Sequence, residues 1–294
     1  MAKFTLRATL AAAGTLALAL TACGGTPTAT ETSPAAGDTP AASETTAAGA
    51  ALETFTDGKF TVATGEPAYS PWVEDNAPES GKGFEAAVAY AVAEELGFAK
   101  EDVVWVRTTF DSAIAPGAKD WDVNIQQFTI TDERKNAVDF SSPYYTTTQA
   151  VIALEGSPAA AATSAADLKD LAFGVQAGTT SAAVYEKAVQ PSKDPLIFNS
   201  SQDTVQALKG NQVDAIVVDL PTALYLAAVE IEGGVVVGQF DDTEGGDEFG
   251  FVLPKGSALT APVTAAVDAV RDAGTLKQLE TEWLSDSIDV PVLK

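Results

Sequence analysis

The stretch GFEAAVAYAVAEELG, residues 83–97, places apolar side chains at helical spacing. Phe84, Val88, Val92 and Leu96 are four residues apart, so they share one face of a predicted helix. The predicted strands around this helix are KFTVATG (59–65), EDVVWVRTT (101–109) and WDVNIQQFTIT (121–131). A strand, a helix and a strand in this order imply parallel pairing through a helical crossover.

The same alternation returns in the second half of the chain. Residues 169–189 read as a strand, a glycine turn and a helix, and residues 200–228 read as a helix, a buried strand and a helix. No linker-like composition separates the two units. The pattern therefore predicts an α/β protein of two lobes, with crossovers at QAVIAL (149–154) and GGVVVGQF (233–240). One large doubly wound sheet is the alternative that the pattern alone leaves open.

Residues 1–22 are predicted to be a signal peptide. Lys3 and Arg7 flank an apolar run that is too short for a stable membrane span. The run ends in LTAC, residues 20–23, which resembles the lipobox of bacterial lipoproteins, where the cysteine is lipidated. An ordinary signal peptide with a chance cysteine is the alternative. Because Cys23 is the only cysteine in the chain, we expect no disulfide framework and no cysteine for catalysis or metal binding.

Residues 23–53 are predicted to be a disordered tether. The stretch is built from Thr, Ala, Pro, Ser and Gly and holds no large apolar side chain before Leu52. Such a composition cannot bury enough surface to offset the chain entropy that folding costs. The folded part is expected to comprise lobe 1, residues 54–148 plus 241–294, and lobe 2, residues 149–240, with hinge strands at the ends of lobe 2.

The composition narrows the classes of function. The formal net charge is −24, which argues against nucleic acid and against anionic lipid headgroups as partners. Histidine is absent, so Ser-His-Asp and Cys-His catalysis and His-rich metal sites are excluded. We therefore expect no catalytic residues, no bound metal and no cofactor. We also expect a monomer.

Four segments together resemble a known family. They are FDSAIAP (110–116), WDVNIQQFTITDERKNAVDFSSPYY (121–145), DLKDLAFGVQAGTT (167–180) and ALKGNQVDAIVVDLPTALY (207–225). In this order they are similar to the polar amino-acid solute-binding proteins of bacterial ABC importers, the extracellular solute-binding proteins of family 3, over roughly residues 55–290.

The resemblance implies both a fold and a function. The fold is the two-lobed, type II periplasmic-binding-protein-like α/β fold, in which each lobe is a mainly parallel sheet flanked by helices and two hinge strands join the lobes. The function is to trap one amino acid in the cleft by hinge closure and to deliver it to a membrane permease. With a lipid on Cys23, the protein would be held on the extracytoplasmic face of the cell membrane.

The resemblance also assigns residues to the ligand. An amino acid is a zwitterion, so its site needs a cation and an anion a few ångströms apart. Arg134 matches the carboxylate-binding arginine, whose planar fork holds both oxygens at once. Asp219 matches the ammonium-binding carboxylate, and Thr129 and Thr180 match further contacts. Because these residues come from both lobes, the ligand would meet all of them only in the closed cleft.

Each of these residues has another role when taken singly. Arg134 fits an exposed ion pair with an acid of the same TDER stretch, and Asp219 fits the cap of the following helix. Thr180 fits an ordinary helix cap, and Thr129 a plain strand residue. Their joint occurrence in the order of the family favours the binding role.

The residues that would contact the ligand side chain are less well defined. Tyr69 and Phe110 match aromatic positions that sandwich this side chain, although Phe110 also fits the core. Glu66 matches an acidic position, and a buried carboxylate there would favour a cationic or amide-bearing amino acid; a solvated loop carboxylate is the alternative. Gln126 and Gln127 stand where relatives often have small residues, so Gln127 either fills space or offers its amide to the ligand.

Two other functions remain open from the sequence. The first is an enzyme on the same scaffold, a dehydratase or lytic transglycosylase-like protein, for which Glu66 is the only attractive general acid. The second is a sensory lipoprotein that binds an amino acid without feeding a transporter. Trp72, which replaces a common phenylalanine, is assigned to the lobe core.

Overall fold

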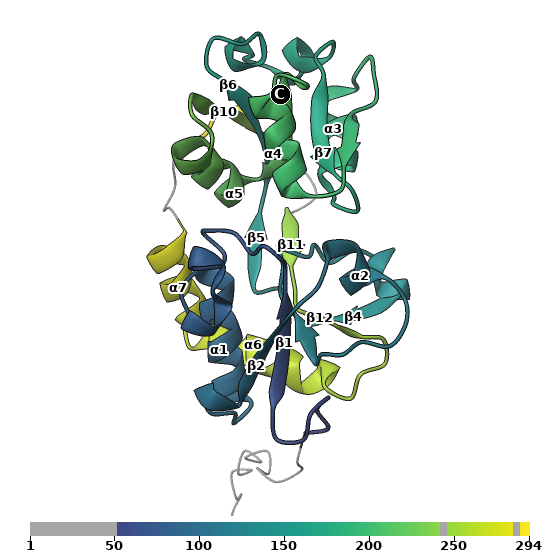
Figure 1. Cartoon of the computed structure of the whole chain (residues 1–294), viewed down its shortest axis with the longest axis vertical. Coiled ribbons are helices and arrows are strands. Elements are labelled where there is room, and N and C mark those ends of the chain that lie inside the picture. Colours follow the sequence, from purple (N-terminus) through teal and green to yellow (C-terminus); the bar gives the residue numbers. More distant parts are fainter. Residues whose placement is uncertain (1–51, 242–245, 285–288) are drawn as a thin grey trace, which may run out of the picture. The chain divides into compact units, whose positions relative to one another are not determined.

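Helices and strands alternate along the chain and form two α/β lobes (Figure 1). The computed structural model describes residues 52–241, 246–284 and 289–294. All of them belong to one compact unit, residues 50–294. Cys23, the predicted signal peptide and residues 23–51 of the predicted tether lie outside the described residues.

Lobe 1 is built on a five-stranded sheet. In spatial order its strands are β2 (Val103–Arg107), β1 (Phe60–Thr64), β3 (Val123–Asn124), β12 (Val252–Pro254) and β4 (Val138–Phe140). The helices of this lobe are α1 (Phe84–Glu95), α2 (Phe110–Ile114), α6 (Thr260–Asp272) and α7 (Thr275–Trp283). Since α1 connects β1 to β2 and these strands are parallel, the predicted strand–helix–strand unit is confirmed.

Lobe 2 is built on a separate six-stranded sheet, so the alternative of one large sheet is wrong. In spatial order its strands are β13 (Val292–Leu293), β10 (Gly234–Phe240), β6 (Gln149–Leu154), β9 (Ala215–Asp219), β7 (Phe173–Gln176) and β8 (Leu196–Phe198). The helices are α3 (Ser181–Val189), α4 (Ser201–Lys209) and α5 (Leu220–Tyr225), which continues as a π-helical turn, Leu226–Glu230.

Short 3-10 helices fill several connections. They are Glu74–Asn76, Pro78–Ser80, Lys100–Asp102, Arg134–Asn136, Ala159–Ala161 and Ala165–Leu168.

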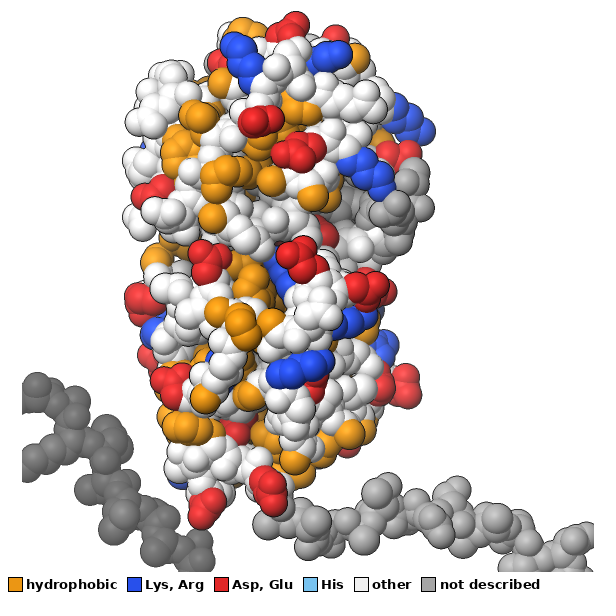
Figure 2. Space-filling model, turned by 90° about the vertical axis from the view of Figure 1, so that its right-hand side faces the viewer, with side chains coloured by type: hydrophobic (Ala, Val, Ile, Leu, Met, Phe, Trp, Pro, Cys, Tyr) orange, Lys and Arg blue, Asp and Glu red, His pale blue; other side chains and the backbone are white. Residues whose placement is uncertain are grey.

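No helix among the described residues is both apolar and long enough to pass through a bilayer. On the face shown in Figure 2, both the acidic and the basic side chains are spread over the two lobes.

The connection between the lobes differs from the sequence prediction. The segments expected to cross over, residues 149–154 and 233–240, pair with each other inside the six-stranded sheet as β6 and β10. A separate antiparallel pair, β5 (Tyr145–Thr147) and β11 (Asp247–Phe249), lies between the lobes (Figure 1). The C-terminal strand β13 also differs, because it joins β10 of lobe 2 although residues 241–294 were assigned to lobe 1.

Both sheets are mixed rather than mainly parallel. In lobe 1, β12 runs antiparallel to β3 and to β4, and in lobe 2, β6 runs antiparallel to β10 and to β9. These antiparallel strands belong to the segments that pass from one lobe to the other. They enter their sheets from the junction between the lobes instead of from a helical crossover, which accounts for their opposite direction.

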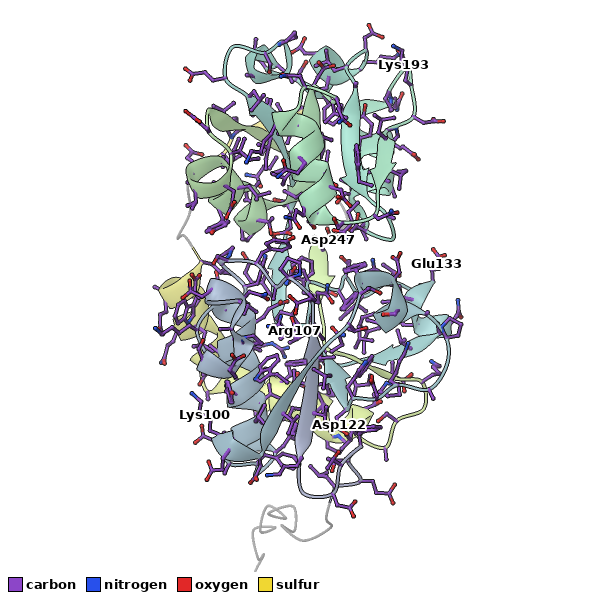
Figure 3. The ribbon with its side chains drawn as sticks, in the orientation of Figure 1. Lys100, Arg107, Asp122, Glu133, Lys193 and Asp247 are labelled. Carbon is purple, nitrogen blue, oxygen red and sulfur yellow. The ribbon has the colours of Figure 1, made fainter. Side chains whose placement is uncertain are left out.

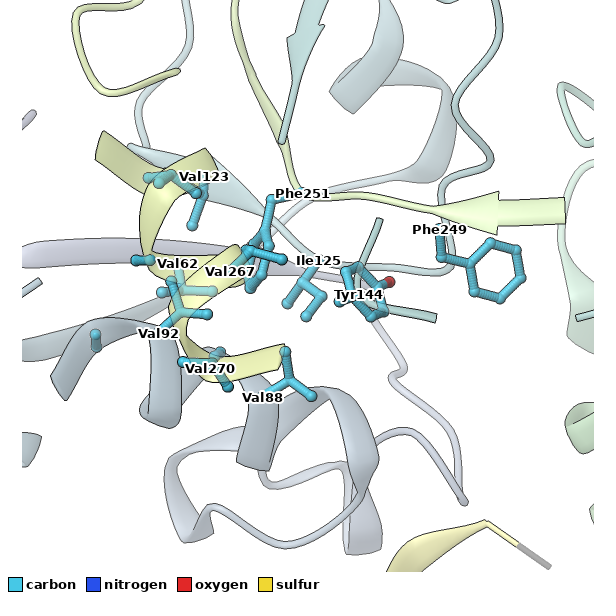
Figure 4. Packing of buried hydrophobic residues seen from close by; sticks show 14 of the residues in the cluster. Val62, Val88, Val92, Val123, Ile125, Tyr144, Phe249, Phe251, Val267 and Val270 are labelled. Atoms are coloured by element: carbon cyan, nitrogen blue, oxygen red, sulfur yellow. The ribbon is translucent and has the colours of Figure 1, made fainter. Parts of the chain in front are cut away.

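Burial follows the periodicity of the sequence in both lobes. Phe84, Val88 and Val92 of α1 are fully buried and share one cluster with the apolar side chains of α6 (Figure 4). Fully burying such a side chain contributes about 1.5–3 kcal/mol. In lobe 2, alternate residues of β6 enter different clusters, with Val151 in the cluster that includes α3 and Ile152 in the cluster that includes α4. Both faces of this sheet are therefore covered by helices.

The start of α1 generates a prediction about stability. Gly83 has φ +98, and a Cβ there would lie 2.6 Å from the carbonyl oxygen of Trp72, whereas Gly97 has φ +90 and open space around it. Gly97→Ala is expected to cost about 1 kcal/mol through backbone strain alone. Gly83→Ala adds a backbone clash, so we expect it to cost at least about 3 kcal/mol. Urea unfolding of both variants measures this, and equal costs would contradict the account.

Candidate functional site

A cavity of about 290 Å³ is lined by residues of both lobes. The predicted ligand-contact residues all line it: Glu66, Tyr69, Phe110, Gln127, Thr129, Arg134, Thr180 and Asp219. The side chain of Asp247 lies at the level where the two lobes meet (Figure 3). The sequence resemblance thus selected residues that are far apart in the chain and lie together in the fold.

Arg134 is buried at this cavity, with an exposed fraction of only 9%. Its Nη1 donates to the carbonyl oxygen of Thr129 at 2.7 Å, and its Nη2 donates to the carbonyl oxygen of Gly178 at 2.7 Å. One acceptor belongs to lobe 1 and the other to lobe 2. Burial lowers the pKa of Arg134 from its ordinary value. An exposed ion pair within the TDER stretch is therefore excluded, and Asp132 instead pairs with Lys135 at 3.1 Å.

Asp219 is both a helix cap and a lining residue of the cavity. It is the last residue of β9, and its carboxylate accepts hydrogen bonds from the backbone N–H of Thr222 at 3.0 Å and from the Thr222 hydroxyl at 2.8 Å. Burial raises the pKa of Asp219 to about 6, although the bonds from Thr222 oppose the rise. A cationic ligand group beside this carboxylate would favour its charged form.

Thr180 connects the cavity to the strands between the lobes. It occupies the cap position of α3, yet its side chain makes no capping bond. Its hydroxyl donates instead to Asp247 at 3.1 Å and lies 3.5 Å from the hydroxyl of Thr129. Asp247 also accepts from the side-chain amide of Gln149 at 2.5 Å, and burial raises the pKa of Asp247. The alternative that the Thr180 hydroxyl is an ordinary cap of α3 is therefore wrong.

Two aromatic residues provide walls of different kinds. The Tyr69 hydroxyl is buried without a hydrogen-bond partner among the described residues, so a ligand can satisfy it. Burial is the largest cause of the raised pKa of Tyr69. Phe110 stacks on Phe128 with ring centroids 4.4 Å apart, and the guanidinium of Arg134 lies 5.5 Å from its ring centroid. Phe110 therefore belongs both to the core and to the cavity wall.

Glu66 differs from the buried carboxylate that was expected. Its side chain is 57% exposed, and its Oε2 lies 3.5 Å from Nε of Arg107. The side-chain amide of Asn76 donates to Oε1 at 3.1 Å. Because solvent and a neighbouring cation offset its charge, Glu66 would repel an acidic ligand only weakly. The structure therefore favours the solvated-loop alternative for this residue.

The hydrogen bonds of Gln127 argue against a direct contact between its side-chain amide and the ligand. Its backbone N–H donates to Glu85 at 2.7 Å, and its side-chain amide donates to the other oxygen of the same carboxylate. Its φ of 50° places it in the left-handed region and interrupts the predicted strand 121–131, of which only β3 is formed. Gln126 keeps a buried side-chain oxygen without a partner among the described residues.

Trp72 belongs to the core of lobe 1 and also contacts lobe 2. It is 1% exposed and packs edge-on against Phe84, Tyr145 and Phe249. Its indole N–H donates to the hydroxyl of Thr222 at 2.8 Å. Because this hydroxyl donates in turn to Asp219, a chain of hydrogen bonds runs from the core of one lobe to a cavity carboxylate of the other.

Sequence reasoning missed several residues of the site. Asp247 lies in an acid-rich stretch where nothing distinguishes it, and Gln149, whose amide donates to Asp247, lies in an apolar strand. Glu85 could have been singled out from the sequence, because it is an acid at the start of a run of apolar residues. Among the described residues, no group of three or more Cys, Asp or Glu side chains is arranged to hold a metal ion.

Residues 61–286 match the model of the bacterial extracellular solute-binding proteins, family 3. The chain belongs to this family. It is 31% identical over 242 residues to the L-arginine-binding protein of Pseudomonas aeruginosa, covering 80% of this chain and 92% of that protein. The family assignment accounts for the two-lobed fold.

The solved structures that are similar to this member of the family include two that bear on its ligand. One is an ancestral arginine-binding protein bound to arginine, with 31% identity, a TM-score of 0.65, and coverage of 78% of this chain and 99% of that one. The other is an ancestral amino acid-binding protein that is a precursor of cyclohexadienyl dehydratase, with 30% identity, a TM-score of 0.61, and coverage of 78% and 96%.

The raised pKa values of two carboxylates in this family 3 protein generate a prediction about pH. Burial raises the folded-state pKa of Asp219 to about 6 and that of Glu85 to about 7, against about 3.9 and 4.3 in an unfolded chain. The folded state therefore binds more protons between pH 4 and 7, so the free energy of unfolding should fall as the pH rises through this window. Asp247 contributes in the same direction.

Urea unfolding of the ligand-free protein between pH 5 and 8 measures this effect. The Asp219→Asn/Glu85→Gln variant keeps nearly all of the acidic surface and serves as the control for general charge repulsion. We expect a shallower pH dependence in this variant than in the wild type. Parallel curves for the two proteins would show that these two carboxylates are not the source.

Proposed function

We propose that the protein is the substrate-binding component of an ABC importer. It captures one polar amino acid in the cavity by hinge closure and delivers the amino acid to a membrane permease. The observation that carries the proposal is that a buried guanidinium of lobe 1, Arg134, and a half-buried carboxylate of lobe 2, Asp219, line the same cavity.

The hydrogen bonds of Arg134 explain why a carboxylate is the preferred occupant. Its two hydrogen bonds go to neutral carbonyl oxygens, that of Thr129 in its own lobe and that of Gly178 in the other lobe. A ligand carboxylate is a stronger acceptor for a guanidinium and supplies the opposite charge that a buried cation needs. Each charge-assisted bond contributes roughly 1.5–3 kcal/mol. A few such bonds, less the cost of closure, support micromolar binding, about 8 kcal/mol.

The ligand side chain is proposed to be cationic or amide-bearing. Within the described part of the chain, Tyr69 offers a hydroxyl without a hydrogen-bond partner and Gln126 a carbonyl oxygen without one, and the latter can only accept a hydrogen bond. Glu66 and Glu230 also line the cavity. The similar proteins named for arginine support this class, and arginine is the first choice within it.

We further propose that a lipid such as palmitate, attached to Cys23, holds the protein at the extracytoplasmic face of the cell membrane. The support is the LTAC motif at residues 20–23 and the low-complexity composition of residues 24–51. The protein would act as a monomer without cofactor. An enzymatic role is less favoured, because Glu66, the acid predicted for it, is exposed and ion-paired with Arg107.

The proposed ligand class predicts the outcome of a thermal-shift screen. The purified protein is tested with the twenty amino acids and ornithine at equal concentration. Arginine, lysine, ornithine or glutamine is expected to raise the melting temperature, because a ligand that binds only the folded state stabilises it. Glutamate is expected to do little. A shift with glutamate alone would overturn the ligand class, and no shift with any amino acid would overturn the function.

The role of Arg134 predicts the result of calorimetry with the best ligand of that screen. Arg134→Ala is expected to abolish detectable binding, and Arg134→Lys to weaken it at least about 100-fold, since lysine cannot form the paired bonds. Lys135→Ala removes the adjacent exposed cation and should leave the affinity unchanged. Circular dichroism verifies that the variants fold. Wild-type affinity in a folded Arg134→Ala protein would remove Arg134 from the site.

A further inference from the structure

Glu85 is a fully buried acid that does not itself line the cavity. It lies in the first turn of α1 with an exposed fraction of 0% and is not among the described residues that line the cavity. A carboxylate in this position needs several donors to offset the loss of its hydration. The donors that it recruits indicate what it does.

Three donors converge on Glu85, and two of them belong to one residue. The backbone N–H of Gln127 donates to Oε1 at 2.7 Å, and the side-chain amide of Gln127 donates to Oε2. The third donor is the hydroxyl of Tyr144, which binds Oε1. Glu85 therefore holds Gln127 by both its backbone and its side chain.

Gln127 needs such a restraint. A non-glycine residue in the left-handed region costs roughly 1–2 kcal/mol, and Gln127 has a φ of 50°. The turn that it makes sets the course of the backbone between Gln126 and Thr129, both of which line the cavity. The carbonyl oxygen of Thr129 is one of the two acceptors of the Arg134 guanidinium.

Tyr144 extends the restraint to the junction of the lobes. It precedes β5, one of the two strands between the lobes, and its ring packs 5.5 Å from that of Phe251 in the core of lobe 1 (Figure 4). Its backbone N–H donates to the carbonyl of Phe249 in β11 at 2.8 Å. The Glu85 carboxylate thus connects the backbone beside the ligand to the strands that join the lobes.

We propose that Glu85 is a positioning residue for the amino-acid site, and that it acts by holding Gln127 in the left-handed turn that presents residues 126–129 to the ligand. This inference rests on the proposed function. Gln127 then contributes through its backbone geometry instead of through a ligand contact. A site organised before binding gains affinity because less ordering remains to be done on association.

Calorimetry with L-arginine, or with the best ligand of the thermal-shift screen, tests the effect on binding. Glu85→Ala is expected to raise the Kd at least about 10-fold, a change of about 1.4 kcal/mol. Adding Gln127→Gly to Glu85→Ala should restore most of the lost affinity, because glycine adopts the left-handed backbone without a restraint. Glu94→Ala, which removes an exposed acid of the same helix, is the control and should keep the wild-type Kd.

The double variant Glu85→Ala/Gln127→Gly distinguishes a residue that positions Gln127 from one that only stabilises lobe 1. A residue that only stabilises lobe 1 would lower the free energy of unfolding on substitution while the Kd of the folded protein stayed unchanged, and the added glycine would restore nothing. Either result overturns the proposal. If Glu85→Ala fails to fold, Glu85→Gln replaces it. The glutamine offers one acceptor and places an N–H₂ group against other donors, so it too should weaken binding, and wild-type affinity would count against the proposal.

Hydrogen–deuterium exchange of the ligand-free protein tests the restraint without any ligand. The amides of residues 126–129 are expected to exchange faster in Glu85→Ala or Glu85→Gln than in the wild type, and Glu94→Ala should match the wild type. Unchanged exchange in the folded Glu85 variants overturns the proposal. A wild-type protein that binds no amino acid, together with faster exchange in the variants, would end the proposed function while preserving the role of Glu85 in holding the turn.

Discussion

The burial of one guanidinium is the constraint on which the site depends. Arg134 cannot lose its proton at neutral pH, so its donors must find acceptors inside the protein. The fold supplies these acceptors from both lobes, through the carbonyl of Thr129 on one side and that of Gly178 on the other. The aromatic ring of Phe110 covers one face of the cation. Both lobes thus contribute an acceptor to the same buried cation.

Local patterns in the sequence were sufficient for much of the fold. The spacing of Phe84, Val88 and Val92 predicted α1 and its buried face, and the parallel pairing of β1 with β2 followed from the order of elements. The site could not be predicted from local patterns in this way. Arg134 could have been part of an exposed ion pair and Asp219 only a helix cap, and composition could not exclude either role. Their similarity to a family, in the right order along the chain, brought them together, and the structure shows both at one cavity.

The remaining features depend on contacts between distant parts of the chain. The strands between the lobes, β5 and β11, are short, and their partners lie about a hundred residues apart, so no local period reveals the pairing. Asp247 looks like any acid of its stretch until the fold buries it beside Gln149. For Glu66, the resemblance indicated an acidic residue near the ligand but did not show whether its side chain is buried. The structure shows an exposed side chain beside Arg107.

The indole of Trp72 gives the molecule a built-in optical reporter. Its N–H is bonded to a hydroxyl of the opposite lobe while its ring stays among aromatic side chains of its own lobe. Separation of the lobes would break that bond and admit water to the indole nitrogen without moving the ring from its packing. Trp105, Trp121 and Trp283 also fluoresce, so with each of them replaced by phenylalanine the emission of Trp72 should shift in wavelength when the lobes separate, and the proposed opening and closing can be followed without attaching a dye.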